Sequence, residues 1–366
     1  MNKKISVGLV YGGRSGEHHI SLLTALAVVQ AMDYDRYDIT PIYITREGAW
    51  RSSDRLLAPV ASVEALTFTE EHIIQPVALS SSWMGSAYPV LTESNLDVVF
   101  PLLHGTFGED GTIQGLLEMA NLPYVGSGVL ASALGMDKIM MKKIFAQAGL
   151  PQCLFRYFSR SEWEQQQENY IMDIEISMGY PCFVKPANLG SSVGISKVRH
   201  REELVEAIQY AFQYDRKVIV EENIIAREIE VSVLGNDSPE ASVPGEIVSS
   251  NEFYDYKAKY LDGTSKMVIP AHISDELKEQ LRHMAIRAFQ AIDASGLSRV
   301  DFFLQHADQH ILINEINTMP GFTPFSMYPL LWKESGKPYR ELLDDLIRLA
   351  IERFEEKQKI QYTFEI

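Results

Sequence analysis

Asp301, Glu315 and Asn317 place three oxygen-bearing side chains in two segments whose other residues are mostly apolar. If residues 298–304 and 310–317 form a β-hairpin, Asp301 lies opposite Glu315, and the two-residue period of a strand puts Asn317 on the same face. Two carboxylates and an amide suit magnesium held together with phosphate oxygens, whereas zinc would favour His or Cys. A set of solvated edge charges is the alternative. Because the neighbouring residues are apolar on both faces, these acids need a cation, and the sequence favours a metal site.

Arg299 comes two residues before Asp301 in the same predicted strand. Beside a metal and phosphate, a guanidinium can stabilise the negative charge that develops on a transferred phosphoryl group or a tetrahedral oxyanion. A purely structural partner of the two acids is the alternative, and the functional role is favoured. The sequence leaves both roles open.

Residues 185–194 place Lys185 at the end of a predicted strand, before a loop rich in glycine and serine that contains Ser191 and Ser192. Such a loop offers backbone amides and hydroxyls to phosphate oxygens. The chain has no G-x-x-x-x-G-K-[ST] motif, so a nucleotide would be covered by a loop between strands rather than held in a P-loop. An ordinary β-turn is the alternative.

Two other glycine-rich segments carry weaker signals. Residues 126–131 match the dinucleotide fingerprint with Ala in the last place. No acid follows about 20 residues later to hold a ribose, which argues against NAD binding. Residues 12–16 precede a helix that begins near Glu17. By default, an acid in a first turn offsets the helix dipole.

The elements that must position these groups change in kind along the chain. The first third alternates strands and helices, and its continuous apolar runs predict parallel strands covered on both faces. Later segments predict an antiparallel sheet, and the polar and aromatic stretch 249–267 has the length of a lid. We expect strands at 4–11, 38–45, 96–103, 180–186, 193–198, 217–222, 228–234, 240–248, 298–304 and 310–317, and helices at 21–29, 112–120, 129–148, 202–214, 275–295 and 339–357.

Composition excludes several classes of protein. The chain has 366 residues, 46% apolar and 22% charged, which predicts a folded protein of two or three domains. Its 33 basic and 49 acidic residues give a net charge of -16, which argues against a nucleic acid or membrane partner. The two cysteines, Cys153 and Cys182, form neither a redox pair nor a zinc framework. With no signal peptide or bilayer-length apolar run, we expect a cytoplasmic protein.

Together these segments resemble the D-alanine:D-alanine ligases, bacterial cell-wall enzymes of the ATP-grasp superfamily, over nearly the whole chain. Seven motifs in family order carry the resemblance: residues 12–18, 104–111, 135–138, 185–194, 253–260, 299–301 and 314–323. His19 departs from the pattern, which has an acid after the Glu-His pair. Glu17 itself is intact.

The resemblance implies an α/β and α+β fold of the ATP-grasp type. A parallel N-terminal domain (1–125) would bind the first substrate, and central (126–217) and C-terminal (218–366) domains would grip ATP, with a lid at 249–267. It implies ligation of two D-alanine molecules for peptidoglycan through an acyl phosphate, with ATP, two Mg²⁺ ions (Mn²⁺ as an alternative) and a homodimer. A closed lid is expected because acyl phosphates hydrolyse in water.

The resemblance also assigns roles to residues. The expected ATP-binding residues are Lys138, Lys185, Ser192, Glu221, Glu222, Ile224 and Glu228, and the expected metal ligands are Asp301, Glu315 and Asn317. Glu17 is expected to pair with the first substrate's ammonium and to join Ser191 and Tyr260 in a hydrogen-bonded triad. Lys259 would reach the transferred phosphate. Arg299 and the Gly321 amide would form an oxyanion hole, and Ser326 would take the second substrate's carboxylate.

Three alternatives remain. A D-alanine:D-lactate ligase would share nearly every motif, but that branch carries histidine in place of the lid tyrosine, so Tyr260 favours a second amino acid. A non-catalytic nucleotide-binding module, or a dehydrogenase using residues 126–131, would not need Asp301, Glu315 and Arg299 intact.

Overall fold

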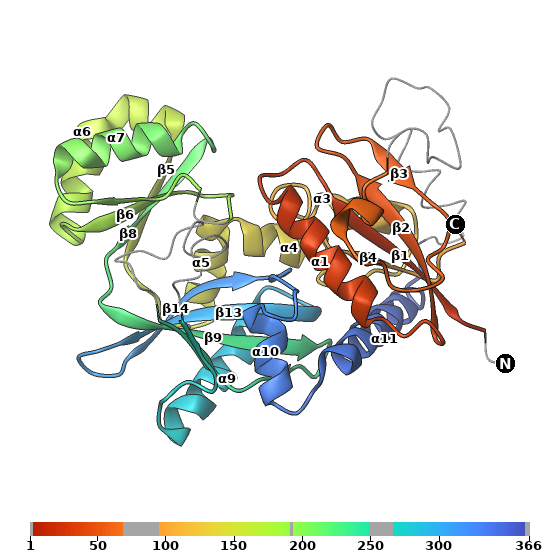
Figure 1. The fold of residues 1–366 in the computed structure, drawn as a ribbon. Coiled ribbons are helices and arrows are strands. Elements are labelled where there is room, and N and C mark those ends of the chain that lie inside the picture. The colour runs from red at the N-terminus through yellow and green to blue at the C-terminus, as the bar shows by residue number, and fades with distance from the viewer. Residues whose placement is uncertain (1–2, 69–94, 191–192, 249–265, 363–366) are drawn as a thin grey trace.

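A computed structural model describes residues 3–68, 95–190, 193–248 and 266–362. These described residues form three β-sheets, each with helices packed against it (Figure 1). In Figure 1 the central sheet lies at the upper left, the N-terminal sheet at the right, and the C-terminal sheet below and between them. Mixed α/β structure with a largely parallel first sheet and antiparallel later sheets confirms the predicted fold class.

The N-terminal sheet has the strand order β3-β2-β1-β4. Its elements are β1 (Ile5–Gly12), α1 (His18–Ala31), β2 (Tyr37–Ile44), β3 (Trp50–Ser52), the 3₁₀ helix η1 (Val63–Leu66), β4 (Val98–Pro101) and α3 (Thr112–Met119). β1 pairs in parallel with β2 and β4, and β3 adds an antiparallel edge. β1 is buried from its second residue onward, as the continuous apolar run predicts for a strand covered on both faces.

The central sheet has the strand order β5-β8-β6-β7 and is antiparallel. Its elements are β5 (Phe155–Ser159), α6 (Arg160–Ser177), β6 (Cys182–Pro186), β7 (Ser196–Val198), α7 (Arg201–Ala211) and β8 (Lys217–Glu222). Both helices cover one face, where Trp163, Ile174 and Leu204 are buried. The opposite face is therefore available to the rest of the molecule.

The C-terminal sheet has the order β12-β11-β9-β13-β14, with β10 also paired to β9. Its strands are β9 (Ala226–Gly235), β10 (Glu240–Ala241), β11 (Gly245–Val248), β12 (Lys266–Val268), β13 (Gly296–Gln305) and β14 (Ile311–Asn317). Helices α4 (Val129–Met136), α5 (Lys138–Gln147) and α9 (Asp275–Ala291) pack on one face, and α10 (Met327–Glu334) packs on the other. The sheet is thus covered on both sides.

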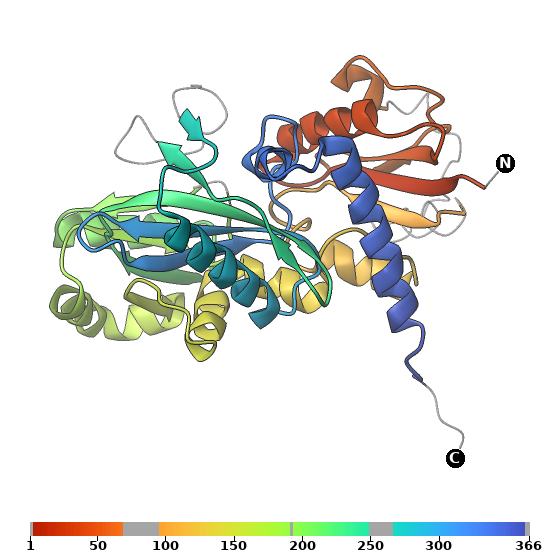
Figure 2. The same ribbon diagram turned by 90° about the horizontal axis from the view of Figure 1, so that it is seen from below.

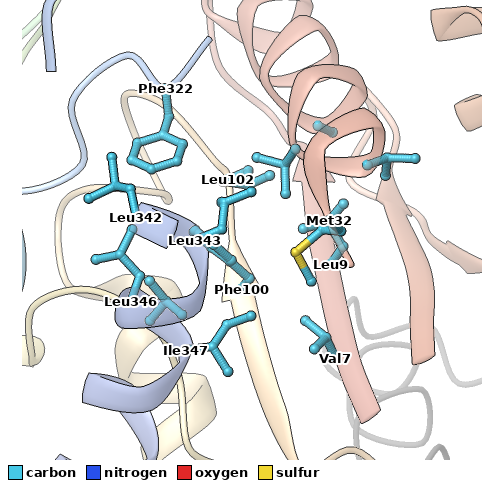
Figure 3. Close-up of a cluster of buried hydrophobic side chains, with 14 of the residues drawn as sticks. Val7, Leu9, Met32, Phe100, Leu102, Phe322, Leu342, Leu343, Leu346 and Ile347 are labelled. Carbon is cyan, nitrogen blue, oxygen red and sulfur yellow. The ribbon is translucent and has the colours of Figure 1, made fainter. Parts of the chain in front are cut away.

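Helix α11 (Tyr339–Lys357) joins the C-terminal part of the chain to the N-terminal sheet (Figure 2). Its apolar side chains share a core with α1 and with strands β1 and β4. Figure 3 shows Leu343, Leu346 and Ile347 close to Phe100 and Leu102, and the ring of Phe322 lies at the top of the same cluster. Residues more than 200 positions apart thus form one core.

The segment 129–148, predicted as one helix, forms two helices, α4 and α5. The prediction of a single continuous helix was wrong. Asp137 has extended backbone angles (φ −83°, ψ 98°), and its side chain accepts hydrogen bonds from the amides of Ile139 and Met140. Asp is among the best N-cap residues, and here it starts α5. The apolar residues on both sides conceal this break in the sequence pattern.

The strand predicted over 240–248 is also divided, into β10 and β11, because Pro244 lies between them and cannot donate to a ladder. Most of the predicted lid, residues 249–265, lies outside the described residues, and 266–268 form β12. The sequence analysis missed β3, η1, β5, α6, β12 and α10. It located the remaining strands and helices to within a few residues.

The domain limits stay a prediction. Because β8 pairs with β5 and β6, we propose that the central unit ends after Glu222 rather than at residue 217. Among the described residues, no helix has the length and apolarity to cross a bilayer.

The shared core predicts that α11 stabilises the N-terminal sheet. Leu346 is 0% exposed, so Leu346→Ala should cost about 2–5 kcal/mol through lost burial and a cavity. Calorimetry should show a lower unfolding midpoint. Leu57→Ala, at a site 93% exposed, is the matched control, and equal midpoints for the two variants would contradict this packing.

Candidate active site

A cleft of about 280 Å³ lies between the central and C-terminal sheets. The predicted site residues that line it are Lys138, Lys185, Glu221, Glu222, Ile224, Glu228, Arg299, Asp301 and Glu315. They come from α5, β6, β8, β9, β13, β14 and the β8–β9 connection. The fold therefore brings together residues up to 177 positions apart.

The β13–β14 hairpin has the predicted register. Asp301 pairs with Glu315, and Arg299 pairs with Asn317. The register shifts between Asp301 and Phe302, so the pairing changes directly beyond the acidic pair. The predicted pairing of Asp301 with Glu315 is confirmed. Asn317 does not line the cleft, and its Oδ1 accepts from the Met319 amide at 3.1 Å. The role of the three residues as metal ligands stays a prediction.

The donor set fits a divalent cation that also binds other oxygens. Within the described ranges, no three His, Cys, Asp or Glu residues form a metal-binding group, so Asp301 and Glu315 with the Asn317 amide supply too few ligands for a closed cage. Mg²⁺ usually keeps waters and takes phosphate oxygens beside one or two carboxylates. The Glu315 side chain is 35% exposed, and its Oε2 lies 3.9 Å from the Lys138 Nζ. The donors of the hairpin therefore leave coordination positions open for water or phosphate oxygens.

Arg299 is tightly paired in this structure. Its Nε and Nη2 donate to the two carboxylate oxygens of Asp301, each at 2.7 Å, and its Nε lies 3.1 Å from Glu230 Oε2. Burial alone lowers the pKa of Arg299, but Asp301 and Glu230 reverse that effect and raise it above its ordinary value. These contacts show Arg299 as a structural partner of the two acids. Stabilising an oxyanion would be a second role of the same guanidinium.

Glu221 lies between two lysines on the opposite side of the cleft. Its Oε1 lies 2.9 Å from Lys142 Nζ, and its Oε2 lies 2.5 Å from Lys185 Nζ. Burial raises the pKa of the Glu221 carboxyl, but the two lysines lower it to about 2. Both oxygens of the Glu221 carboxylate are therefore engaged by lysines.

Lys142 was missed by the sequence reading. It is 1% exposed and one turn after Lys138 on α5. The four-residue spacing, which puts both lysines on one helix face, was the available signal.

Lys138 reaches from α5 to the glycine-rich loop. Its backbone amide donates to Ala187 O at 3.0 Å, and its Nζ donates to Leu189 O at 2.8 Å. Asp137 holds this junction, since one oxygen caps α5 and the other accepts from Lys217 of β8. The start of α5 is therefore fixed to the central sheet.

Glu17 lies close to two glycine-containing loops. A Cβ on Gly105 would lie 2.7 Å from Glu17 Oε2, and one on Gly190 would lie 3.5 Å from the same oxygen. Gly105 also has a positive φ of 74°, so a side chain there would be strained as well as crowded. The Glu17 carboxylate is thus close to the glycine-rich loop that precedes Ser191.

A second acid near Glu17 was also missed. Glu109 Oε1 accepts from the Gly105 amide at 3.0 Å and lies 3.4 Å from His104 Nδ1. Burial raises the pKa of Glu109, and the adjacent Glu17 charge raises it further. His104 and Glu109 therefore form a polar group behind Glu17.

Gly321 and Ser326 lie together in the loop before α10. A Cβ on Gly321 would lie 3.2 Å from Ser326 Oγ, which accepts from the Thr323 amide at 3.1 Å. Between them, Phe322 is 0% exposed in the core shared with α11. This core fixes the loop in place. Ser191, Ser192, Lys259 and Tyr260 lie outside the described residues.

The glycine-rich segment that begins at Gly126 has a structural explanation. Gly126 has φ +99°, and a Cβ on Gly296 would lie 3.2 Å from its backbone. Close packing of two chain segments therefore accounts for glycine at these positions.

Comparison with known proteins identifies a consistent set of relatives. A family model described as the D-ala D-ala ligase N-terminus matches residues 6–127, and one described as the D-ala D-ala ligase C-terminus matches residues 144–348. The chain is similar to the D-alanine–D-alanine ligase of Bacillus cytotoxicus, with 58% identity covering 98% of this chain and 99% of that protein. The Bacillus licheniformis protein of the same name is 56% identical, covering 99% and 100%.

Solved structures agree with this similarity. The D-alanine-D-alanine ligase from Coxiella burnetii superposes with a TM-score of 0.81 at 35% identity, covering 97% of this chain and 96% of that one. The VanG D-Ala:D-Ser ligase from Enterococcus faecalis also gives 0.81, at 36% identity, covering 95% and 100%.

The Asp137 junction yields a stability prediction. Asp137→Ala removes the cap of α5 and the partner of Lys217, whereas Asp137→Asn keeps a capping oxygen and removes only the charge. The alanine variant should lose about 0.5–2 kcal/mol more than the asparagine variant. Thermal unfolding of both variants would measure this difference, and equal midpoints would show that the cap does not stabilise α5.

Proposed function

The chain belongs to the D-alanine–D-alanine ligase family, and from that premise we propose that it joins two D-alanine molecules into D-alanyl-D-alanine for peptidoglycan, with conversion of ATP to ADP and phosphate. The observation that carries this proposal is the cleft in which Lys138 and Lys185 face Asp301 and Glu315. The two lysines suit phosphate oxygens, and the paired carboxylates of the hairpin suit a divalent ion. Both are needed to make a carboxylate reactive through phosphoryl transfer.

On the nucleotide side, Lys138, Lys185 and Ser192 hold the phosphates in this proposal. Glu222, Ile224 and Glu228, together with the Glu221 main chain, take adenine and ribose, with Glu228 on the ribose. These adenine- and ribose-binding residues lie along one cleft, at the end of β8 and the start of β9, which supports the assignment. Adenine bound at this end would leave the phosphates of ATP near Lys185.

On the metal side, Asp301, Glu315 and Asn317 would hold Mg²⁺, with two ions or Mn²⁺ as finer expectations of the family. A divalent ion supplies charge neutralisation for the transferred phosphoryl group. Arg299 orients Asp301 through two parallel hydrogen bonds. The protein's own contribution is a rigid pair of carboxylates on adjacent strands.

The amino acid substrates occupy the side of the cleft near α1 and α10. Glu17 binds the first ammonium, and Ser326, at the N-terminus of α10, binds the second substrate's carboxylate, where the helix dipole favours negative charge. The Gly321 amide and Arg299 stabilise the tetrahedral oxyanion. Ser191, Tyr260 and Lys259 complete the expected triad and phosphate contact.

Two further expectations of the resemblance are also proposals. A homodimer can be tested by sedimentation. A cytoplasmic location is supported by the use of ATP and by two buried free thiols, Cys153 and Cys182, which suit a reducing compartment.

The direct test is ADP release with Mg²⁺ and different amino acids. We expect rapid release and dipeptide formation with D-alanine, and little with L-alanine. D-Serine must be included because a structural neighbour is named as a D-Ala:D-Ser ligase. D-Lactate must be included because it is the substrate of the alternative ligase. Faster depsipeptide formation with D-lactate would favour the alternative ligase, and ATP binding without turnover would favour a non-catalytic module.

Glu315 supplies the second prediction. Glu315→Gln removes one of two carboxylates from the proposed ion site, so the Mg²⁺ concentration for half-maximal turnover should rise on the order of 100-fold. Glu355→Gln, on the exposed surface of α11, is the matched control. Unchanged magnesium dependence in Glu315→Gln would refute the metal assignment.

A further inference from the structure

Lys142 is a buried cation that does not itself line the cleft. The described lining includes Glu221 and Lys185, and Lys142 lies behind Glu221. Its side chain is 1% exposed, whereas that of Lys185 is 13% exposed. A buried lysine without a counterion would lose its proton or destabilise the fold, so its pairing with Glu221 is a requirement.

The three side chains form an uneven charge cluster. Lys142 and Lys185 each engage a different oxygen of one carboxylate, at 2.9 and 2.5 Å. The other contacts of Lys142 are uncharged, namely Cys153 Sγ at 3.5 Å and the Phe155 ring at 5.7 Å. The cluster therefore carries one surplus positive charge, and Lys185 is the member that lines the cleft.

Lys142 also reaches this cluster from another part of the molecule. Its neighbour Met141 on α5 packs into the core of the C-terminal sheet, whereas Glu221 and Lys185 belong to the central sheet. Ile139 of the same helix packs against Ala187 and Ile219. The ammonium is thus held in place by packing on both sides.

We propose that Lys142 is a positioning residue for phosphate recognition: by neutralising Glu221, it leaves the charge of Lys185 available to the phosphates of ATP. This inference rests on the proposed function. Without Lys142, Glu221 and Lys185 form a neutral pair, and the wall of the cleft loses its surplus charge. Because the cluster is shielded from water, one charge has a large effect on an anion nearby.

The test compares ligands with and without phosphates. In the full-length Lys142→Met variant, calorimetric titration should show that ATP binds at least about tenfold more weakly, whereas adenosine binds as in the wild type. Lys143→Met is the matched control, because Lys143 is the next residue of α5, is exposed, and lies over the Tyr157 ring at 4.3 Å. It should leave both ligands unaffected.

A double variant separates charge from structure. Lys142→Met with Glu221→Gln removes a cation and its carboxylate together and restores the surplus charge of Lys185. We expect ATP binding to recover most of the loss seen in Lys142→Met, even though one more buried contact has been removed. The double variant has no buried carboxylate at position 221, so it remains informative if Lys142→Met folds poorly.

The outcomes are distinct. Equal ATP affinity in the Lys142→Met and Lys143→Met variants, equal weakening of ATP and adenosine, or no recovery in the double variant would overturn the role of Lys142. The wild type and Lys185→Met report on the proposed function separately. If the wild type does not bind ATP, or if Lys185→Met binds it equally well, the assignment of the cleft itself fails.

Discussion

Charged groups that are held away from water must be paired, and this constraint organises the candidate site. Glu221 is paired with two lysines, and Arg299 with Asp301 and Glu230. Each set is assembled from more than one element, so the pairing is satisfied only when those elements are in place. The same contacts that stabilise the fold thereby leave a surplus cation on one wall of the cleft and carboxylates on the other.

Apolar packing fixes the loops that carry other polar groups of the proposed site. Phe322 lies in the core between the N-terminal sheet and α11, with its ring 6.1 Å from that of Phe100. The loop on either side of it carries Gly321 and Ser326, while α1 of the same N-terminal unit begins next to Glu17. A single apolar core thus relates the proposed sites for the two amino acids, although the residues are about 300 positions apart in the chain.

Local patterns in the sequence predicted what local physics determines. The expected β-hairpin predicted the pairing of Asp301 with Glu315, and the motif around Lys185 located the glycine-rich loop. Long-range contacts were not legible. The break at Asp137, the burial of Lys142 and the pairing of Arg299 with Glu230 all depend on elements that meet only in the folded chain. Helix α6 is different, since its capping box of Ser159 and Glu162 was visible but its mostly polar face hid the helical period.

The difference in charge between the two walls explains why the proposed reaction needs a divalent ion. On the hairpin side, one guanidinium, Arg299, meets three carboxylates, Glu230, Asp301 and Glu315. A triphosphate brought against these acids would be repelled, because like charges in a shielded cleft interact strongly. On the opposite wall, the surplus charge of Lys185 attracts the same phosphates. A small dication between phosphate and hairpin turns the repulsion into coordination, so the two walls can approach one ligand from both sides.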